Sequence, residues 1–259
     1  MTAAQLHREY FPQVSEDTVR RRLKDEGLKN YKQRTVPLLK APQVDRRLEW
    51  GESVLLWTVQ NWRAVIYSDA SKFEVFRVDT RRRVWRMPGE ALHPQKTAKK
   101  VAHGGGSVMV WGCITKSGVG RLHRISEQLT STGYAKILSE DLLGTLSDHR
   151  IHPHDIYFQR DGDKKQWTKL VMTLLEDHGI DSLPWPASSP DMNIIENLWA
   201  YLDEKVHNKK KPPKNTEELW ESLRRKWLKI DQKYIDNLYE SIPTRIQRLV
   251  EVKGGNTKY

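Results

Sequence analysis

The sequence contains a single cysteine, Cys113, among 259 residues. One cysteine excludes an intrachain disulfide and a zinc site built from several cysteines, and it is typical of a reducing intracellular setting. Every hydrophobic run falls far short of the roughly 20 residues that a membrane-spanning helix needs. The first residues lack a charged segment followed by an apolar one, so we expect no secretory signal. The sequence predicts a globular protein with no membrane as partner.

Acidic residues are outnumbered: 44 lysines and arginines face 33 acids, for a formal net charge of +11. The basic residues cluster in four runs, at 20–24, 81–83, 99–100 and 209–214. On charge alone, polyanions are the natural partners of such a chain, nucleic acid first and an acidic membrane surface second, and of the two we expect nucleic acid. A basic surface that is merely solvated is the alternative. The last run, "KKKPPK", is compatible with a nuclear import signal, a phosphate contact or a solvated linker.

Residues 1–34 predict a small helical unit. "TAAQLHREYF" is a short amphipathic helix, and "SEDTVRRRLKDEGL" opens with Ser15 as a cap and ends at Gly27. Two helices joined by a short turn are typical of a helix-turn-helix, whose second helix enters the major groove of DNA. The alternative is an ordinary helical hairpin with an exposed basic face. The candidate DNA contacts are Arg20, Arg21, Arg22 and Lys24.

The rest of the chain reads as a linker and helix over 35–62, a large domain over 63–205, and a basic linker with two or three helices over 206–259. In the large domain, apolar and alternating patterns predict strands, and the first two could form a hairpin. Longer periodic patterns predict helices between the later strands. Strands that come first and then alternate with helices predict an α/β fold with a mixed sheet flanked by helices. The predicted strands are 64–70, 72–78, 107–114, 118–125, 155–161 and a short one near 181–185; the predicted helices are 132–146, 164–178 and one starting near Pro190.

Two of the predicted strands end on aspartates, Asp69 and Asp161, and ligand sites in open α/β sheets lie at the carboxyl ends of strands. The 34 residues between Asp161 and Glu196 are enough to bring Glu196 back over the sheet. Three converging carboxylates repel one another unless a cation is present. Oxygen ligands suit Mg²⁺ or Mn²⁺, and a pair of such ions is the clamp used for in-line phosphoryl transfer. Alternatively, some of the 33 acids fall at strand ends by chance.

Glu196 lies in the stretch "SSPDMNIIENLW", which predicts the start of a helix. Its serines suit a cap and Pro190 suits the first helical position. Met192, Ile195 and Trp199 recur at helical spacing, and Glu196 borders this apolar stripe. A glutamate near a helix start can simply favour the helix dipole. Its position beside a buried stripe is what makes it a candidate ligand.

Five segments together resemble the mariner superfamily of cut-and-paste DNA transposases, and within it the Sleeping Beauty-like branch. They are "VIYSDASKFEVF", "VWRMPGEALHP", "HGGGSVMVWGCI", "SSPDMNIIENLW" and "KGGNTKY", in order along nearly the whole chain. The spacing from Asp161 to Glu196 is also that of the branch's Asp-Asp-Glu triad. The resemblance implies a ribonuclease H-like catalytic core with an insertion at about 79–106.

The resemblance also implies a function. Asp69, Asp161 and Glu196 would be the catalytic residues and would hold two Mg²⁺ ions, with Mn²⁺ as a possible substitute. The expected reaction is hydrolysis at the element ends, followed by strand transfer into target DNA at TA sites. The expected partners are double-stranded DNA carrying the terminal repeats and further copies of the chain, in a homodimer or higher assembly on DNA. The expected location is the nucleus.

The sequence departs from the family pattern in several places. Members usually carry two helix-turn-helix units, and only the second fits here, so we expect weakened binding to terminal repeats. Changes beside metal ligands can cost about 10–100-fold in metal affinity or activity. A catalytically inactive, transposase-derived DNA-binding protein is therefore the main alternative, and a ribonuclease H-like nuclease acting on RNA–DNA hybrids is another. The altered neighbours of the triad are Ala70, Gly162, Lys164, Gln166 and Ile194.

Overall fold

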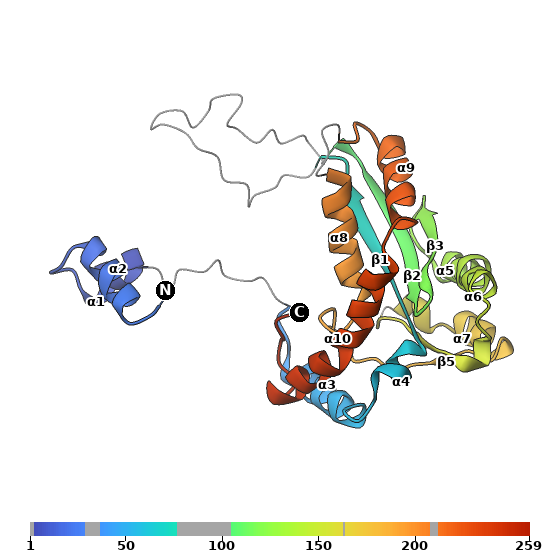
Figure 1. Cartoon of the computed structure of the whole chain (residues 1–259), viewed down its shortest axis with the longest axis horizontal. Coiled ribbons are helices and arrows are strands. Elements are labelled where there is room, and N and C mark those ends of the chain that lie inside the picture. The colour runs from blue at the N-terminus through green and yellow to red at the C-terminus, as the bar shows by residue number, and fades with distance from the viewer. Residues whose placement is uncertain (1–2, 29–36, 77–104, 163, 208–211) are drawn as a thin grey trace. The chain divides into compact units, whose positions relative to one another are not determined.

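The computed structural model describes residues 3–28, 37–76, 105–162, 164–207 and 212–259 (Figure 1). Most of the predicted insertion, the basic runs at 81–83 and 99–100, and part of the run at 209–214 lie outside these residues. The chain divides into two compact units, Met1–Pro37 and Leu38–Tyr259.

The small unit contains the two helices expected from the sequence, α1 (Ala3–Tyr10) and α2 (Glu16–Asp25). Ser15 caps α2, because its side chain accepts a hydrogen bond from the backbone N–H of Thr18. Gly27 follows the end of α2 with a φ of +76°, a conformation that glycine adopts without strain. Val19 on α2 is buried in this unit.

The large unit is built on a five-stranded mixed sheet in its described part. Its strands are β1 (Val65–Glu74), β2 (Ser107–Thr115), β3 (Gly118–Ile125), β4 (Tyr157–Gln159) and β5 (Asp181–Ser182), in the order β3-β2-β1-β4-β5. Strands β1, β2 and β3 pair antiparallel, whereas β4 pairs parallel with both β1 and β5. The mixed sheet predicted from the sequence is confirmed, and β2 and β3 match their predicted ranges almost residue for residue.

Strand β1 corrects one prediction. The sequence suggested two strands, 64–70 and 72–78, joined as a hairpin. Instead β1 is continuous, and eight of its residues, from Tyr67 to Glu74, pair with β2 from Ile114 to Ser107. The segment between the two predicted strands has no Gly or Pro to turn the chain. Its backbone N–H and C=O groups are instead paired in the ladder with β2. Asp69 therefore lies inside a strand and not at its end.

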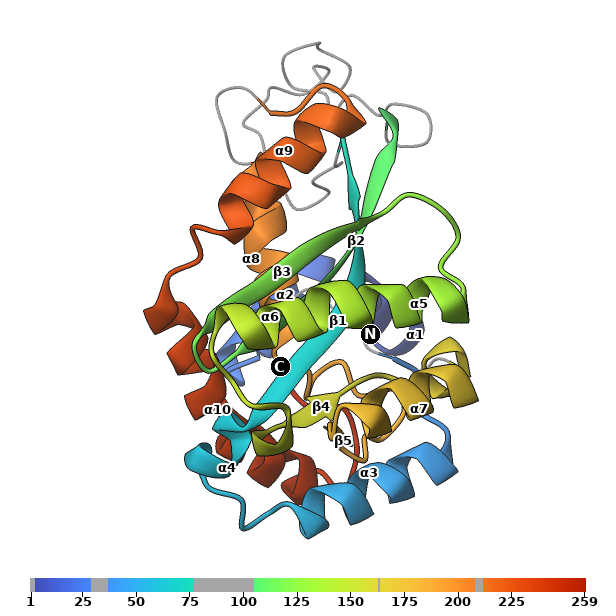
Figure 2. The same ribbon diagram turned by 90° about the vertical axis from the view of Figure 1, so that its right-hand side faces the viewer.

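Helices cover both faces of the sheet (Figures 1 and 2). One core joins the sheet to α3, α4 and the last three helices, and the other joins it to α5, α6 and α7. None of the helices in the described ranges has the length and apolar character to cross a membrane. The helices are α3 (Ala41–Ser53), α4 (Val59–Arg63), α5 (Ser131–Ile137), a π-helical segment (Leu138–Leu142), α6 (Leu143–Asp148), α7 (Lys169–Asp177), α8 (Ile195–His207), α9 (Thr216–Trp227) and α10 (Gln232–Glu251), with 3₁₀ turns at Pro153–Asp155 and Lys164–Trp167.

One helical prediction in this region needs adjustment. The single helix expected within 35–62 is two helices, because α3 ends at Ser53 and Thr58 caps the start of α4. The tryptophans of this region belong to the core: Trp50 and Trp62 are buried, with ring centroids 6.2 Å apart. Cys113, on β2, is a buried core residue.

Candidate active site

Strand pairing places Asp69 and Asp161 on neighbouring strands. The parallel pair β1–β4 matches Tyr67 with Gln159, and each aspartate lies two residues farther along its own chain segment. Asp69 is still within β1, while Asp161 lies just beyond the end of β4. The two carboxylates therefore come from the same level of adjacent segments, although the prediction that each ends a strand is wrong for Asp69.

Helix α8 carries Glu196 in its first turn, since the helix begins at Ile195 and not near Pro190 as the sequence suggested. The preceding residues form turns, and Ser188 has a φ of +59°. The serines and the proline that resemble a helix cap are thus part of a loop. Glu196 is placed where the positive end of the helix dipole favours a carboxylate.

A buried amide ties the start of α8 to β1. The side chain of Asn193 accepts a hydrogen bond from the backbone N–H of Ile195 at 3.3 Å and donates one to the carbonyl of Ser68 at 3.3 Å. Ser68 also binds β4: its N–H donates to the side-chain oxygen of Gln159, and its hydroxyl donates to the carbonyl of Gln159. These contacts hold together the three segments that carry Asp69, Asp161 and Glu196.

The three carboxylates line one cleft of about 490 Å³. Its other lining residues are Gln159, Gly162, Trp185, Pro186, Ala187, Ser188, Ser189, Pro190 and Asn193. Within the described ranges, no three His, Cys, Asp or Glu side chains are gathered closely enough to hold one metal ion. The triad thus shares a cleft without forming a closed ligand set.

Electrostatics in the cleft disfavours negative charge. Burial, followed by the charge of Glu196 and then that of Asp161, raises the pKa of Asp69 from 3.8 to about 7. Burial also raises the pKa of Glu196. A site of crowded, partly buried carboxylates gains free energy by taking up a proton or a cation. The three carboxylates offer only oxygen atoms as ligands, which suits a hard divalent ion such as Mg²⁺ or Mn²⁺.

Sequence reasoning missed the residues that surround Asp161. The indole N–H of Trp167 donates to the carbonyl of Asp161 at 2.9 Å. The guanidinium of Arg160, which is fully buried, lies 3.9 Å from the centroid of the Trp167 ring and also donates to the carbonyl of Gln166. Burial lowers the pKa of Arg160. The run "QRDGDKKQW" contains these residues, but nothing in its pattern shows that they fold back on the aspartate.

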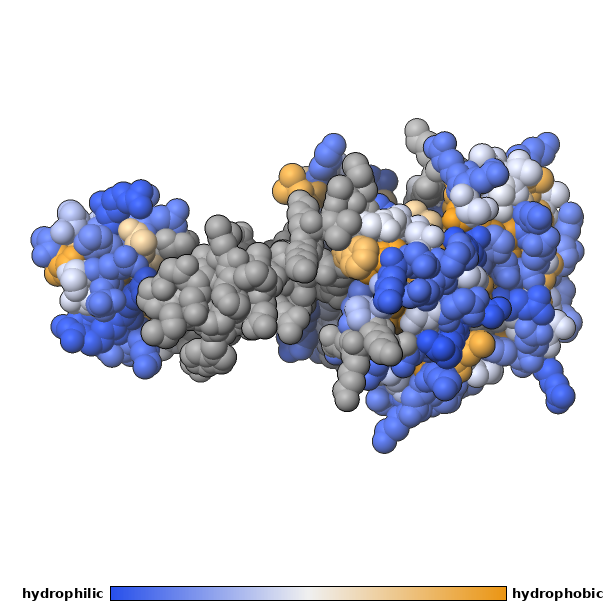
Figure 3. Space-filling model, turned by 90° about the horizontal axis from the view of Figure 1, so that it is seen from above, coloured by the Kyte–Doolittle hydropathy of each residue, from blue (hydrophilic) through white to orange (hydrophobic). Residues whose placement is uncertain are grey.

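The four candidate DNA contacts lie on α2 of the small unit. Arg20, Arg21, Arg22 and Lys24 are all exposed, and Arg20 makes an ion pair with Glu16 one turn earlier. Figure 3 shows a mostly hydrophilic surface on this unit. An exposed basic helix is able to contact phosphates and base edges, and no acid other than Glu16 pairs with these four side chains in the described part of the chain.

Comparison with protein families gives two matches. Residues 1–55 match a family of helix-turn-helix domains described as transposase. Residues 64–220 match the family described as DDE superfamily endonuclease. Asp69, Asp161 and Glu196 all lie within the second match, which covers more than half of the chain.

Several curated proteins are similar over nearly their whole length. The transposase of the transposable element Tcb2 from Caenorhabditis briggsae is 33% identical over 93% of this chain and 87% of the relative. The Tc1 transposase from Caenorhabditis elegans is 33% identical over 96% of this chain and 89% of the relative. Among solved structures, the Mos1 mariner paired end complex with Mn has a TM-score of 0.83 at 21% identity, covering 100% of this chain and 76% of that one. A pre-cleavage Mos1 transpososome has a TM-score of 0.84 at 19% identity, with the same coverage. These structures establish the ribonuclease H-like fold that the sequence predicted.

Proposed function

The chain belongs to the Tc1/mariner family of transposases, and from this premise we propose that Asp69, Asp161 and Glu196 are its catalytic triad. The family assignment makes the chain a DNA-cleaving transposase with a DDE endonuclease domain. The proposed reaction is cut-and-paste transposition: phosphodiester hydrolysis at the element ends, then attack of the freed 3′-hydroxyl on target DNA at TA sites. The observation that carries the proposal is that the three carboxylates line one cleft.

We propose two divalent ions, Mg²⁺ or Mn²⁺, as the cofactor of this cleft. When bound, such a pair supplies activation of the attacking oxygen and stabilisation of the leaving oxygen. The raised pKa of Asp69 supports this, because a cation would relieve the repulsion from Glu196 and Asp161 that contributes to it. Since the carboxylates are not gathered as a closed ligand set, binding would have to draw them together.

The chain's own residues hold the carboxylates of the proposed triad in position. Asp69 is held in the middle of β1 by pairing with Gly112 of β2, so its backbone has little freedom. Glu196 is placed by the hydrogen bonds of Asn193 to both α8 and β1. One carboxylate is thus carried by a strand and another by the start of a helix. Catalytic groups need such rigid elements to hold them in position.

DNA binding by the small unit completes the proposal. Arg20, Arg21, Arg22 and Lys24 would contact the terminal repeats through phosphates and base edges. We propose that two or more copies of the chain assemble on a pair of element ends, and that the protein acts in the nucleus. The exposed basic face of α2 and the match to a helix-turn-helix transposase family support DNA binding.

Nicking of supercoiled plasmid DNA tests the active-site assignment. The wild-type chain is expected to nick in Mg²⁺ or Mn²⁺ and to be inactive with EDTA. Glu196→Gln removes one charged ligand and should lower the nicking rate by more than the about 10–100-fold that loss of an outer-shell partner costs, whereas DNA binding in a gel-shift assay persists. Glu176→Gln on α7, an exposed glutamate, is the matched control. Nicking that survives Glu196→Gln contradicts the assignment.

The second candidate function is a catalytically inactive DNA-binding protein. It is favoured by the absence of a closed ligand set among the described residues and by the changed neighbours of Asp161, such as Gly162. Titration calorimetry with Mn²⁺ separates the two. Heat that disappears in Asp69→Asn and Asp161→Asn supports the nuclease, and no such heat supports the inactive protein.

A further inference from the structure

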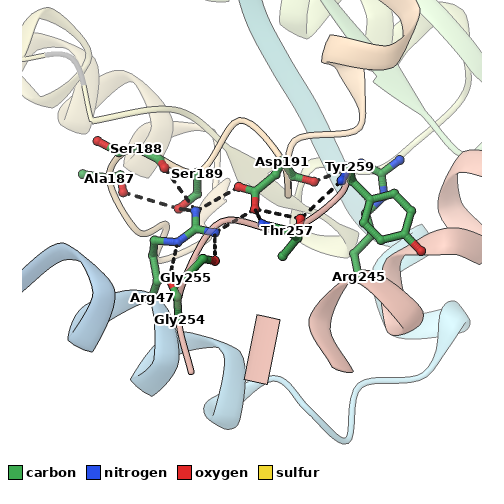
Figure 4. A network of polar contacts seen from close by, with 10 residues as sticks. All are labelled: Arg47, Ala187, Ser188, Ser189, Asp191, Arg245, Gly254, Gly255, Thr257 and Tyr259. Carbon is green, nitrogen blue, oxygen red and sulfur yellow. Dashed lines mark hydrogen bonds and ion pairs between the residues drawn. The ribbon is translucent and has the colours of Figure 1, made fainter. Parts of the chain in front are cut away.

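We propose that Arg47, Asp191 and Thr257 form a clamp that positions the Glu196-bearing segment for catalysis, an inference that rests on the proposed function. The three residues come from α3, from the loop before α8, and from the segment 254–259 that follows α10. None of the three residues lines the cleft that contains Asp69, Asp161 and Glu196. The clamp is the central feature of Figure 4.

Arg47 is fully buried, and each of its nitrogens makes hydrogen bonds. Its Nη1 and Nη2 donate to Oδ1 and Oδ2 of Asp191 at 2.9 and 2.7 Å, which is a bidentate ion pair. Nε donates to the carbonyl of Gly254 at 2.9 Å, and Nη2 also donates to that of Gly255 at 3.1 Å. One guanidinium therefore joins the loop before α8 to the segment 254–259.

Arg47 also reaches the wall of the cleft directly. Its Nη1 donates to the hydroxyl of Ser189 at 2.7 Å and to the carbonyl of Ser188 at 3.1 Å. Both serines line the cleft. Ser188 has a φ of +59°, a backbone conformation that residues other than glycine rarely adopt. The buried cation fixes this conformation of the cleft wall.

Asp191 is held from the other side by Thr257. Its Oδ2 accepts hydrogen bonds from the Thr257 hydroxyl at 2.9 Å and from the Thr257 backbone N–H at 3.2 Å. Burial alone would raise the pKa of Asp191, but the hydrogen bonds and charge of Arg47, together with the Thr257 donors, lower it. The carboxylate is therefore charged, and four donors specify its orientation.

A second arginine extends the clamp past Glu196. Arg245 of α10 donates to the carbonyl of Asp191 at 3.0 Å and to the side-chain oxygen of Asn197 at 2.8 Å. Its guanidinium lies over the ring of Tyr259, 4.7 Å from the centroid. Asp191, five residues before Glu196, and Asn197, directly after Glu196, are thus bound to the same arginine.

Glycine at 254 allows the close approach that the clamp needs. Gly254 has a φ of +78°, and a Cβ there would lie 2.1 Å from the carbonyl oxygen of Val44 on α3. The chain can therefore run against α3 only with glycine at this position, which brings the Gly254 and Gly255 carbonyls to Arg47.

The loop that the clamp binds has no helix or strand of its own between Ser188 and Ile194. Its position depends on tertiary contacts, and Glu196 lies only five residues after Asp191. Catalytic groups must be held within about 0.5 Å of their productive geometry. Loosening the clamp should therefore reduce metal binding and cleavage more than it reduces folding.

Thr257→Val tests this, because it removes the hydroxyl donor and keeps the shape. Thr257→Ser keeps the hydroxyl donor. Thr244 is an exposed threonine of α10, and Thr244→Val is the matched control. We expect Thr257→Val to slow Mn²⁺-dependent plasmid nicking about 10–100-fold and to raise the Mn²⁺ concentration for half-maximal rate. Thr257→Ser and Thr244→Val should stay within about threefold of the wild type. All are measured at a temperature where circular dichroism shows each variant folded.

Hydrogen exchange supplies a readout independent of cleavage. Thr257→Val should speed exchange of the amides in 187–198 and leave the amides of β2 and β3 unchanged. If the wild type nicks but Thr257→Val changes neither nicking nor exchange, or if Thr257→Ser loses as much as Thr257→Val, the clamp is refuted. If the wild type does not nick in any metal while the exchange result holds, the proposed function fails and the clamp stands as a structural element. Should Thr257→Val not fold, Thr257→Ala, which only removes atoms, takes its place.

Discussion

Neutralising Asp69 should stabilise the metal-free protein, and the size of the effect follows from its surroundings. Its pKa lies at about 7 in the folded chain against a usual value of 3.8. A raised folded-state pKa gives stability that is complete below pH 3.8 and is lost as the pH rises through about 7. At about 1.4 kcal/mol per pH unit, the full loss is roughly 4 kcal/mol, of which roughly 2–3 kcal/mol falls between pH 5 and pH 8.

Asp69→Asn resembles the protonated side chain and should remove this dependence. We expect the metal-free variant to be more stable than the wild type by about 2–4 kcal/mol at pH 8 and by much less at pH 5. Mn²⁺ should stabilise the wild type at pH 8 and leave the variant unchanged, since bound ligand stabilises only the state that binds it. The exposed Asp177→Asn of α7 is the control for a generic loss of charge.

Urea unfolding in EDTA, followed by tryptophan fluorescence, measures the effect. All ten tryptophans lie after residue 37, so the signal reports the large unit alone. A free energy of unfolding that is equal in the wild type and Asp69→Asn at pH 8, with parallel pH profiles, would refute the reasoning. It would mean that Asp69 is neither desolvated nor repelled by its neighbours.

Three further predictions follow from packing, backbone conformation and charge. Trp227→Ala should lower the free energy of unfolding by about 3–5 kcal/mol, because Trp227 is fully buried, stacks on Trp199 and donates to the Gly120 carbonyl; urea unfolding measures this. Gly254→Ala should destabilise the large unit by at least about 1 kcal/mol, and thermal unfolding equal to the wild type would contradict the close approach to α3. Replacing Arg21 and Arg22 together by alanine should reduce the dependence of log affinity for duplex DNA on log salt by about 2, which fluorescence anisotropy at several salt concentrations checks; an unchanged slope would place DNA elsewhere.

The predicted strands show where the sequence suffices. Strands β2 and β3 were predicted within a residue because each has a strong local pattern, and a short turn with Gly118 at a φ of +137° joins them. The convergence of Asp69 and Asp161 was expected because ligand sites lie at the carboxyl ends of strands and because of the family resemblance. The parallel pairing of β1 with β4 brings the two aspartates together. Local pattern thus predicted the strands, whereas the resemblance was needed to choose these two aspartates.

The start of α8 shows where the sequence fails. Ser189 and Pro190 have the residue types of a helix start, yet the hydroxyl of Ser189 accepts a hydrogen bond from Arg47, 142 residues away in the chain. A tertiary contact uses the side chain that a cap would have used, so the helix begins at Ile195. The prediction of a hairpin within β1 failed for the same reason. The residues of β2 that pair with β1 are distant in the sequence, so the local pattern of β1 does not reveal them.

The pairing at the far end of β1 has a consequence for how the family can vary. Glu74 of β1 pairs with Ser107 of β2, and the N–H of Val75 donates to the carbonyl of Gly106. The chain that joins the two strands therefore starts and ends at neighbouring points, five residue pairs along the ladder from Asp69. The entropy of closing such a connection grows only slowly with its length. Connections of different length can therefore join the same two points of the ladder without moving the paired strand that carries Asp69.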